Sequence, residues 1–440
     1  MLRLAFALVV CILGFGGTML MGPIWGLSAF SLFTHITPQQ LSPEVVVPLR
    51  LPFLLSLWVL GGYVFSSRYP RKFSKLPLEF WLMIWMVLGM LAGAGNALNP
   101  YFVYHNATTF AKYIIFFLLF VNILDSREKI RFFLDAQIIS AAWLVYRCWD
   151  LRGRFSGRFE NIDGGVISDS NHFAAAVVLF FPIVVRRIFE GPKWIRIGAA
   201  IGAFGMVMTI IITGSRGGFL GLAVQTMAFF FFYKKYRKKL IIVLICGIIA
   251  IAPFISDYYI QRVSGIFNKD EIEDVGSRSS VESRLDSWSL AYEIWTQFPM
   301  TGCGMGNFRY YMGYHKEGLA WGELGHVAHS LWFQVLGEGG LIVTLPFLWI
   351  ILLFYLKTFR VAGYYKRIGQ QDALGDIYAI QTGFSGFLVC ATFLNRLFYE
   401  PIYWFSGMAV AYVYVIHREL LEKRLGKKRV QIQTRGRRRR

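Results

Sequence analysis

Long apolar runs constrain the fold of this chain more than any other feature of its sequence. About twelve of them approach the roughly 20 residues that a helix needs to cross a bilayer. The 440-residue chain is 55% hydrophobic and 16% charged, whereas soluble domains are about 25% charged. We therefore predict an all-α polytopic membrane protein with about 12 transmembrane helices. The expected spans cover residues 4–22, 48–66, 78–97, 108–124, 130–147, 171–187, 194–213, 217–233, 240–256, 329–356, 378–395 and 401–417.

Basic residues between the runs predict how the chain crosses the membrane. Lys and Arg concentrate in alternate short loops and in the C-terminal tail, and the positive-inside rule places such segments in the cytoplasm. Both termini are then expected to be cytoplasmic. The predicted parts are nine transmembrane helices over 1–256, a large external loop over 257–328, three more transmembrane helices over 329–417 and a basic cytoplasmic tail over 418–440.

The net charge of +20 does not by itself predict binding to nucleic acid. The excess lies in the predicted cytoplasmic loops and tail, where it favours contact with anionic lipid. Of the five cysteines, only Cys148 and Cys303 are expected to face an oxidising compartment, and a disulfide between them is left open. Neither a CxxC motif nor a His/Cys cluster indicates a metal site, and no cofactor is expected.

Three short polar clusters fall on the predicted outer side. They are Gly214–Gly218, Glu282–Trp288 and His326–Ser330. Arg216 is expected to open a helix, whose N–H groups and dipole favour an anion, and its guanidinium can grip a phosphate; the alternative is an arginine that binds lipid headgroups. Arg284 is expected where the loop helix begins, with Ser283 as N-cap. We expect Arg284 either to contact an anion or to pair with Asp286 or Glu282 and order the loop.

His329 opens the predicted tenth span. A neutral imidazole takes up a proton near pH 7, which suits a general base, although a histidine at a helix start also serves as a cap. Asp169, Asn171 and His172 begin the sixth span on the same side, where they contact sugar hydroxyls or cap the helix. The full set of candidate substrate-binding residues is Asp169, Asn171, His172, Asp286, His326, Arg158 and Arg396.

The external loop is predicted to contain an amphipathic helix. Its apolar residues recur at helical spacing, with Leu285, Trp288 and Trp295 among them. Such a helix either lies on the bilayer as a lid over an interfacial site or packs on the rest of the loop. A transporter is the alternative from a different class, and it would place paired charges near the membrane midplane. Here most charges of chemical interest lie at the outer edge, and Lys112 and Glu338 are the main exceptions.

Taken together, these motifs resemble the O-antigen ligase and polymerase superfamily of bacterial inner-membrane glycosyltransferases. The resemblance runs from about Gly157 to Pro346 and covers the three clusters above. It also covers the segments Asp169–His172, Pro299–Gly304 and Gln334–Leu341. The turn Asn395-Arg396 and the residues around His329 look most like the exosortase-associated branch of O-glycosylation ligases.

The resemblance implies a GT-C-like fold in the inner membrane and a metal-independent transfer at its periplasmic face. The donor is a glycan on undecaprenyl diphosphate, and the acceptor is a hydroxyl of a lipid, a glycan or a protein. Arg216 and Arg284 match the arginines assigned to the diphosphate, and His329 matches the histidine assigned to acceptor activation. In-line attack would invert the anomeric centre. A repeat-unit polymerase, whose acceptor is another lipid-linked glycan, is the alternative within the class.

Overall fold

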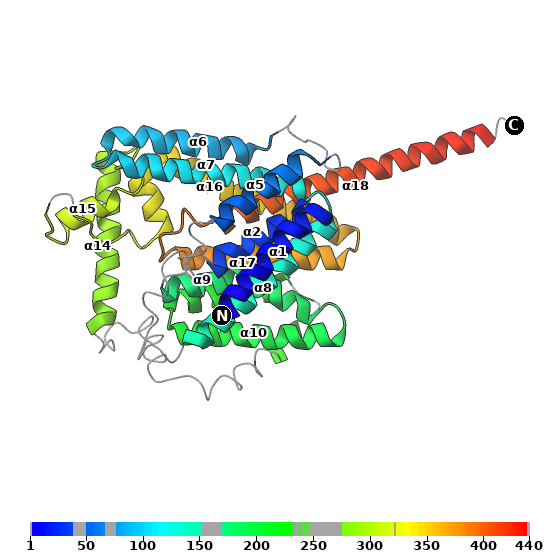
Figure 1. Ribbon diagram of the computed structural model, residues 1–440, viewed down its shortest axis with the longest axis horizontal. Coiled ribbons are helices and arrows are strands. Elements are labelled where there is room, and N and C mark those ends of the chain that lie inside the picture. Colours follow the sequence, from blue (N-terminus) through cyan, green and yellow to red (C-terminus); the bar gives the residue numbers. More distant parts are fainter. Residues whose placement is uncertain are drawn as a thin grey trace.

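A computed structural model describes residues 2–37, 50–66, 76–151, 169–232, 234, 237–238, 241–242, 245, 275–320 and 323–437. Every regular element in these residues is a helix. Most helices lie side by side along the long axis of the molecule, α14 runs across one end, and α18 projects from the other end (Figure 1). The elements are α1 (Leu2–Leu20), α2 (Pro23–Ile36), α5 (Leu51–Val64), α6 (Leu78–Ala92), a 3-10 turn (Gly93–Asn96), α7 (Pro100–Ile123), α8 (Arg127–Leu151), α9 (Ser170–Ile188), α10 (Lys193–Thr213), α11 (Arg216–Phe232), α14 (Val275–Gln297), α15 (Phe308–His315), α16 (Leu331–Arg367), α17 (Gln371–Ala391) and α18 (Pro401–Arg437).

Within the described residues, five helices are long and apolar enough to cross a membrane. They are Leu78–Asn96, Pro100–Ile123, Ser170–Ile188, Lys193–Thr213 and Leu331–Arg367, and three shorter apolar helices accompany them. The all-helical polytopic class is therefore confirmed. The number of twelve spans stays a prediction, because most of the expected span 240–256 lies outside the described residues.

The structure contains a helix, α2, that the sequence analysis did not expect. It forms an antiparallel hairpin with α1: a Cβ atom on Gly14 would lie 2.7 Å from Ala29, and one on Gly17 would lie 2.7 Å from Trp25. With 14 residues, α2 is about 21 Å long, too short to cross the roughly 30 Å hydrocarbon core. Because α2 changes the number of helices before the first basic loop, the cytoplasmic position of the N-terminus stays a prediction.

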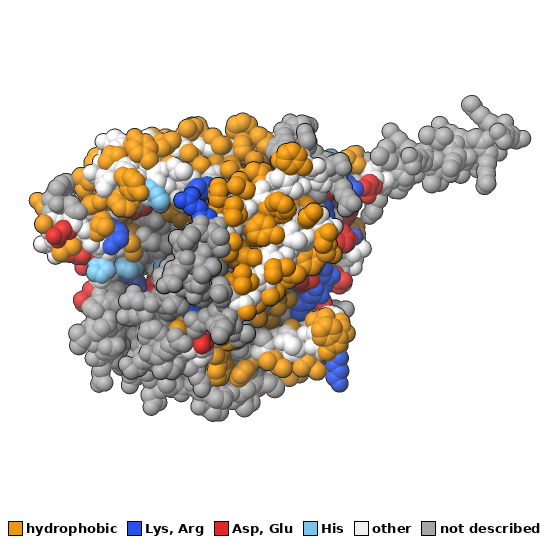
Figure 2. Space-filling view, in the orientation of Figure 1, with side chains coloured by type: hydrophobic (Ala, Val, Ile, Leu, Met, Phe, Trp, Pro, Cys, Tyr) orange, Lys and Arg blue, Asp and Glu red, His pale blue; other side chains and the backbone are white. Residues whose placement is uncertain are grey.

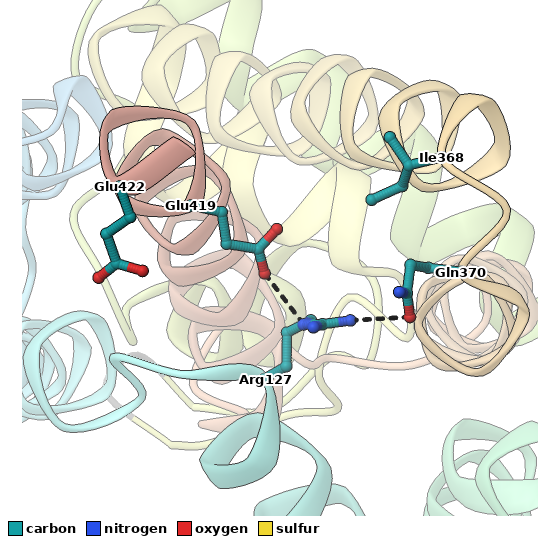
Figure 3. A pocket seen from close by; sticks show the side chains of 5 residues that line it. All are labelled: Arg127, Ile368, Gln370, Glu419 and Glu422. Carbon is teal, nitrogen blue, oxygen red and sulfur yellow. Dashed lines mark hydrogen bonds and ion pairs between the residues drawn. The ribbon is translucent and has the colours of Figure 1, made fainter. Parts of the chain in front are cut away.

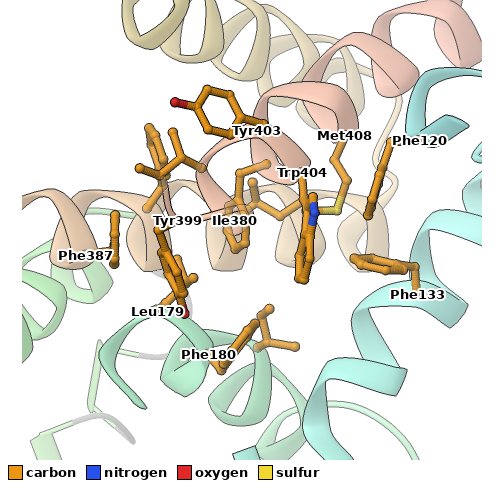
Figure 4. Close-up of a cluster of buried hydrophobic side chains, with 14 of the residues drawn as sticks. Phe120, Phe133, Leu179, Phe180, Ile380, Phe387, Tyr399, Tyr403, Trp404 and Met408 are labelled. Atoms are coloured by element: carbon orange, nitrogen blue, oxygen red, sulfur yellow. The ribbon is translucent and has the colours of Figure 1, made fainter. Parts of the chain in front are cut away.

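Aromatic side chains fill the centre of the bundle (Figure 4). Phe120 stacks on Trp404, with ring centroids 5.7 Å apart, and Phe133 meets Trp404 edge-on. At one border of this core, Tyr399 hydrogen-bonds through its hydroxyl to Nε2 of His35 over 2.8 Å. The core therefore anchors the turn between α17 and α18, residues 392–400, which carries Arg396.

Helix α16 is broken at Gly340, where φ is 57° and ψ is −165°, a conformation that essentially only glycine adopts. The first two N–H groups after the break donate to the carbonyls of Pro299 and Met300 over 2.9 and 3.0 Å. Before the break, the Gly337 carbonyl accepts from the Cys303 N–H over 2.9 Å. The loop that follows α14 thus satisfies backbone groups that the break would leave exposed.

Glu338 holds the same loop from inside α16. Its side chain is hydrogen-bonded to the backbone N–H groups of Gly306 and Phe308 and to the side chain of Gln334, and the residue is 4% exposed. Phe308 is the first residue of α15, so the Glu338 carboxylate serves the start of that helix. This contact gives Glu338 a structural role rather than that of a transport charge.

Ion pairs hold together the end of the bundle from which α18 projects. Lys357 on α16 lies 2.5 Å from the buried Glu79 on α6, and Arg186 pairs with Asp135 and Asp376. A cavity at this end is lined by Arg127, Ile368, Gln370, Glu419 and Glu422 (Figure 3). None of the residues that the sequence analysis proposed for chemistry lines it.

Candidate functional site

Four chain segments meet at the end of the bundle that α14 crosses. They are the start of α9, the turn between α10 and α11, the start of α16, and the turn 392–400. The Ser215 hydroxyl donates to the Asn171 side-chain carbonyl over 2.9 Å, which joins the first two segments. The Ser330 N–H donates to the Asn395 side-chain carbonyl over 3.2 Å, which joins the other two.

Arg216 is the first residue of α11, as predicted. Gly214 ends α10 in the left-handed conformation with φ 59°, and the Ser215 hydroxyl accepts the N–H of Gly218 over 3.1 Å. A Cβ atom on Gly218 would lie 2.7 Å from the Cβ of Ala174 on α9. The glycine therefore lets α11 pack closely on α9, and this contact fixes where Arg216 starts.

Asp169 is the N-cap of α9, one of the two roles foreseen for this segment. Its Oδ1 accepts the N–H groups of Asn171 and His172 over 2.7 and 3.0 Å, and its Oδ2 lies 3.4 Å from the His172 Nδ1. Burial acts to raise the pKa of Asp169, but His172, these N–H groups and Arg396 together lower it below its usual range. Asp169 is therefore a carboxylate at neutral pH.

Charged groups from different segments meet around His172. The imidazole interacts electrostatically with Arg396, with Asp169 and with His329. Arg396 is 7% exposed, and its guanidinium lies over the Tyr399 ring at 4.9 Å. Burial lowers the pKa of Arg396 to about 10, so it stays protonated at pH 7. The structure thus brings four candidate residues together: Asp169, His172, His329 and Arg396.

His329 has an unusual backbone conformation. Its φ of 49° lies in the left-handed region, which only two other non-glycine residues among the described ranges occupy. Ser330 then returns to extended backbone as the N-cap of α16. Such strain costs about 1–3 kcal/mol and is typical of functional sites. A regular cap would not need it, so the geometry favours a specific role for the imidazole.

His326 lies beside His329 but faces a different partner. The two ring centroids are 6.3 Å apart, and the His326 Nδ1 is 2.6 Å from the Glu317 carboxylate. Burial acts to raise the pKa of Glu317, but hydrogen bonds from the backbone and ring of His326 lower it. The His326 side chain is 66% exposed, so it belongs to the rim of this region.

Arg284 lies within α14 rather than at its start. The helix begins at Val275, so the expectation that Ser283 caps it is wrong. The predicted apolar stripe is confirmed in part: Leu285 is 55% exposed, whereas Leu290, Ala291 and Ile294 are buried with residues of the 299–312 region. Their burial favours the alternative in which the stripe packs on the rest of the loop.

An aromatic junction, formed by Trp288, Phe333 and Phe393, joins α14 to the other segments. The Trp288 ring stacks on Phe333 of α16 at 5.3 Å and lies 6.3 Å from Phe393 of the turn 392–400. A Cβ atom on Gly217 would lie 3.5 Å from Phe393. Arg284 precedes Trp288 by four residues, which places both on one face of α14.

Sequence reasoning missed several residues of this region. Asn395 and Phe393 were not candidates, because neither side chain is charged or titratable and neither belongs to a recognisable catalytic motif. Arg158 lies outside the described residues, and Asp286 is exposed on α14. Cys148 and Cys303 are both buried and no disulfide joins them, so the disulfide left open by the sequence is not formed.

The fold and the site define a class: an integral membrane protein that gathers arginine, histidine and carboxylate groups at one end of an all-helical bundle. Such a set can bind an anion and accept a proton. Residues 201–348 match the family model described as O-Antigen ligase, whereas no curated protein matches the chain. The match supports the resemblance to the O-antigen ligase and polymerase superfamily that the motifs indicated.

Proposed function

We propose that this protein transfers a glycan from an undecaprenyl-diphosphate carrier to an acceptor hydroxyl at the periplasmic face of the bacterial inner membrane. The observation that carries the proposal is the strained His329, held near His172, Asp169 and Arg396 at the end of the bundle opposite the projecting basic α18. The O-antigen ligase match over 201–348 supports it, because the matched segment contains Arg216, Arg284 and His329.

In the proposed reaction, the acceptor oxygen attacks the anomeric carbon in line with the leaving diphosphate. His329 takes the acceptor proton, and the bond between the anomeric carbon and the diphosphate oxygen breaks with inversion. Arg216 and Arg284 stabilise the negative charge that develops on the diphosphate, as guanidinium groups do with bidentate geometry and a constant charge. The reaction needs no covalent sugar intermediate and, in this proposal, no metal.

The buried cluster also suggests roles for the remaining groups. Arg396 adds a fixed positive charge beside His172, and the Asp169 carboxylate compensates it. We propose that Asp169, Asn171, His172 and Arg396 line the sugar-binding side of the site, with His326 at its rim.

Purified protein and a lipid-linked donor provide the test. Arg216→Ala, Arg284→Ala and His329→Ala should each abolish or strongly reduce transfer, by about 10²–10⁴-fold for the base. Arg360→Ala is the matched control, because Arg360 is an exposed arginine on α16 far along the helix from His329. Near-normal turnover in the Arg216 and Arg284 variants would refute the proposed diphosphate site. Loss of activity in EDTA that a divalent ion restores would refute the metal-independent mechanism.

The acceptor separates a ligase from a repeat-unit polymerase, which shares the donor chemistry. Deletion of the gene in its native host, followed by mass analysis of lipid-linked glycans, distinguishes them. Accumulation of full-length lipid-linked chains indicates a ligase, and accumulation of single repeat units indicates a polymerase.

A further inference from the structure

We propose that the indole N–H of Trp288 is a third donor to the lipid diphosphate, acting between Arg216 and Arg284. This inference rests on the proposed function, and it assigns a binding role to a residue that the sequence analysis placed only in an amphipathic stripe. Three observations carry it: the fixed orientation of the ring, the state of its N–H group, and the residues around it.

Ring contacts with Phe333 and Phe393 restrict the orientation of the Trp288 ring. Phe333 lies nearly parallel to it, with an interplanar angle of 14° and ring centroids 5.3 Å apart. Phe393 adds a tilted contact at 33°. Two aromatic neighbours from two different elements hold the indole in place, so its N–H has a defined direction before any ligand arrives.

The N–H group of this ring has no acceptor among the described residues, and its nitrogen is buried. Other tryptophans show the usual solution: Trp332 donates to the Thr392 hydroxyl over 3.0 Å, and Trp58 donates to the Phe15 carbonyl over 3.1 Å. A buried donor without an acceptor is costly, and proteins retain few of them. A ligand oxygen would remove that cost.

The surroundings of Trp288 indicate what kind of oxygen this is. Arg284 lies one turn earlier on the same face of α14. Phe393, the second ring neighbour of Trp288, lies close to Gly217, which follows Arg216. An oxygen that reaches the indole is therefore close to segments that carry two cations. An indole N–H donates only, and a donated hydrogen bond is strongest to an anion. The diphosphate supplies such oxygens, and the bond would strengthen as charge builds up on the leaving group.

Trp288→Phe tests the inference, because phenylalanine keeps an aromatic ring for stacking and removes the N–H. We expect a decrease in kcat/KM of about 10- to 100-fold, as for the loss of one hydrogen bond to a charged group. Inhibition by inorganic pyrophosphate should weaken by a similar factor. Trp295→Phe is the matched control: Trp295 lies on α14 with a buried N–H that also has no acceptor among the described residues, but it is two turns from Trp288. We expect its activity to stay within about twofold of wild type.

Replacing Trp288 with a benzothienyl analogue, in which sulfur takes the place of the N–H, gives a second variant that preserves the size and shape of the ring. If this variant loses activity and pyrophosphate inhibition as Trp288→Phe does, at an unchanged unfolding midpoint, the inference is supported. If the analogue is fully active while Arg216→Ala is inactive, the inference fails and the proposed function stands. If Arg216→Ala is active as well, the proposed function itself fails.

Discussion

Replacing Gly340 with alanine should disrupt the contact between α16 and the loop that follows α14. The backbone at Gly340 has φ 57° and ψ −165°, which costs a residue with a side chain about 1–3 kcal/mol. An added Cβ atom would also overlap the carbonyl group of Met300 and the amide nitrogen of Thr301. These are backbone atoms, so a side-chain rotation cannot relieve the overlap.

The magnitude follows from what must move. If the loop shifts away, the two hydrogen bonds that the N–H groups after the break donate to Pro299 and Met300 are lost. Each contributes about 1 kcal/mol when it is exchanged for water. With the backbone strain, the expected loss of stability is about 3–5 kcal/mol. Because this loop connects α14 to α15, the position of Arg284 should become less defined and transfer should decrease as well.

Thermal unfolding in detergent, followed by tryptophan fluorescence, measures the loss of stability. Hydrogen exchange of the amides in 299–306 measures whether the loop shifts, and a transfer assay measures the loss of activity. Gly363→Ala is the matched control, because Gly363 lies in the same helix and a Cβ atom there meets nothing within 4 Å. That variant should be as stable as wild type or slightly more stable. If Gly340→Ala leaves the unfolding midpoint and the hydrogen exchange unchanged, the loop at 299–303 does not depend on hydrogen bonds to the backbone at the helix break, and the reasoning is refuted.

Three further substitutions test other parts of the structure. Glu79→Gln should destabilise the protein by about 3 kcal/mol in thermal unfolding, because it leaves Lys357 without its buried carboxylate; replacing both residues with apolar side chains should restore most of that loss. His329→Gly should be about 1 kcal/mol more stable than His329→Ala, because glycine adopts φ 49° without strain, while both variants lose transfer activity. Asp169→Asn should remove a contribution to stability that depends on pH. Because folding lowers the pKa of Asp169, its carboxylate stabilises the folded protein above the unfolded pKa of about 3.9. This stabilisation is lost as the pH falls through the lower folded pKa. Unfolding midpoints measured from about pH 3 to 6 should then depend less on pH in the variant.

The sequence predicted the class of the fold because membrane helices are identified by composition and length. It also located the starts of α9 and α11, whose caps follow from local rules that Asp169 and Ser215 satisfy. Helix α2 was not predicted, because the pattern for a membrane span requires about 20 residues. A 14-residue helix that is buried along nearly its whole length has neither that length nor a polar face.

The arrangement of the site was harder to predict than its residues. Its histidines and arginines were recognisable as chemical groups, but which of them meet depends on contacts between distant segments. Gly340 lies beside Gly337 and Gly339, yet nothing in the sequence indicated that the loop at 299–303 would contact the helix break there. For the same reason Glu338 looked like a charge within a membrane helix, although its partners include the backbone N–H groups of Gly306 and Phe308.

Neutral polar residues determine how the proposed catalytic groups are placed relative to one another. Asn395 accepts the N–H that follows His329, and the Gln334 side chain accepts the Leu397 N–H. These two hydrogen bonds fix the turn that carries Arg396 against the start of α16. The geometry between His329 and Arg396 therefore depends on two amides that carry no charge. A change at either amide would displace the imidazole and the guanidinium without altering their chemistry, so activity would fall through position alone.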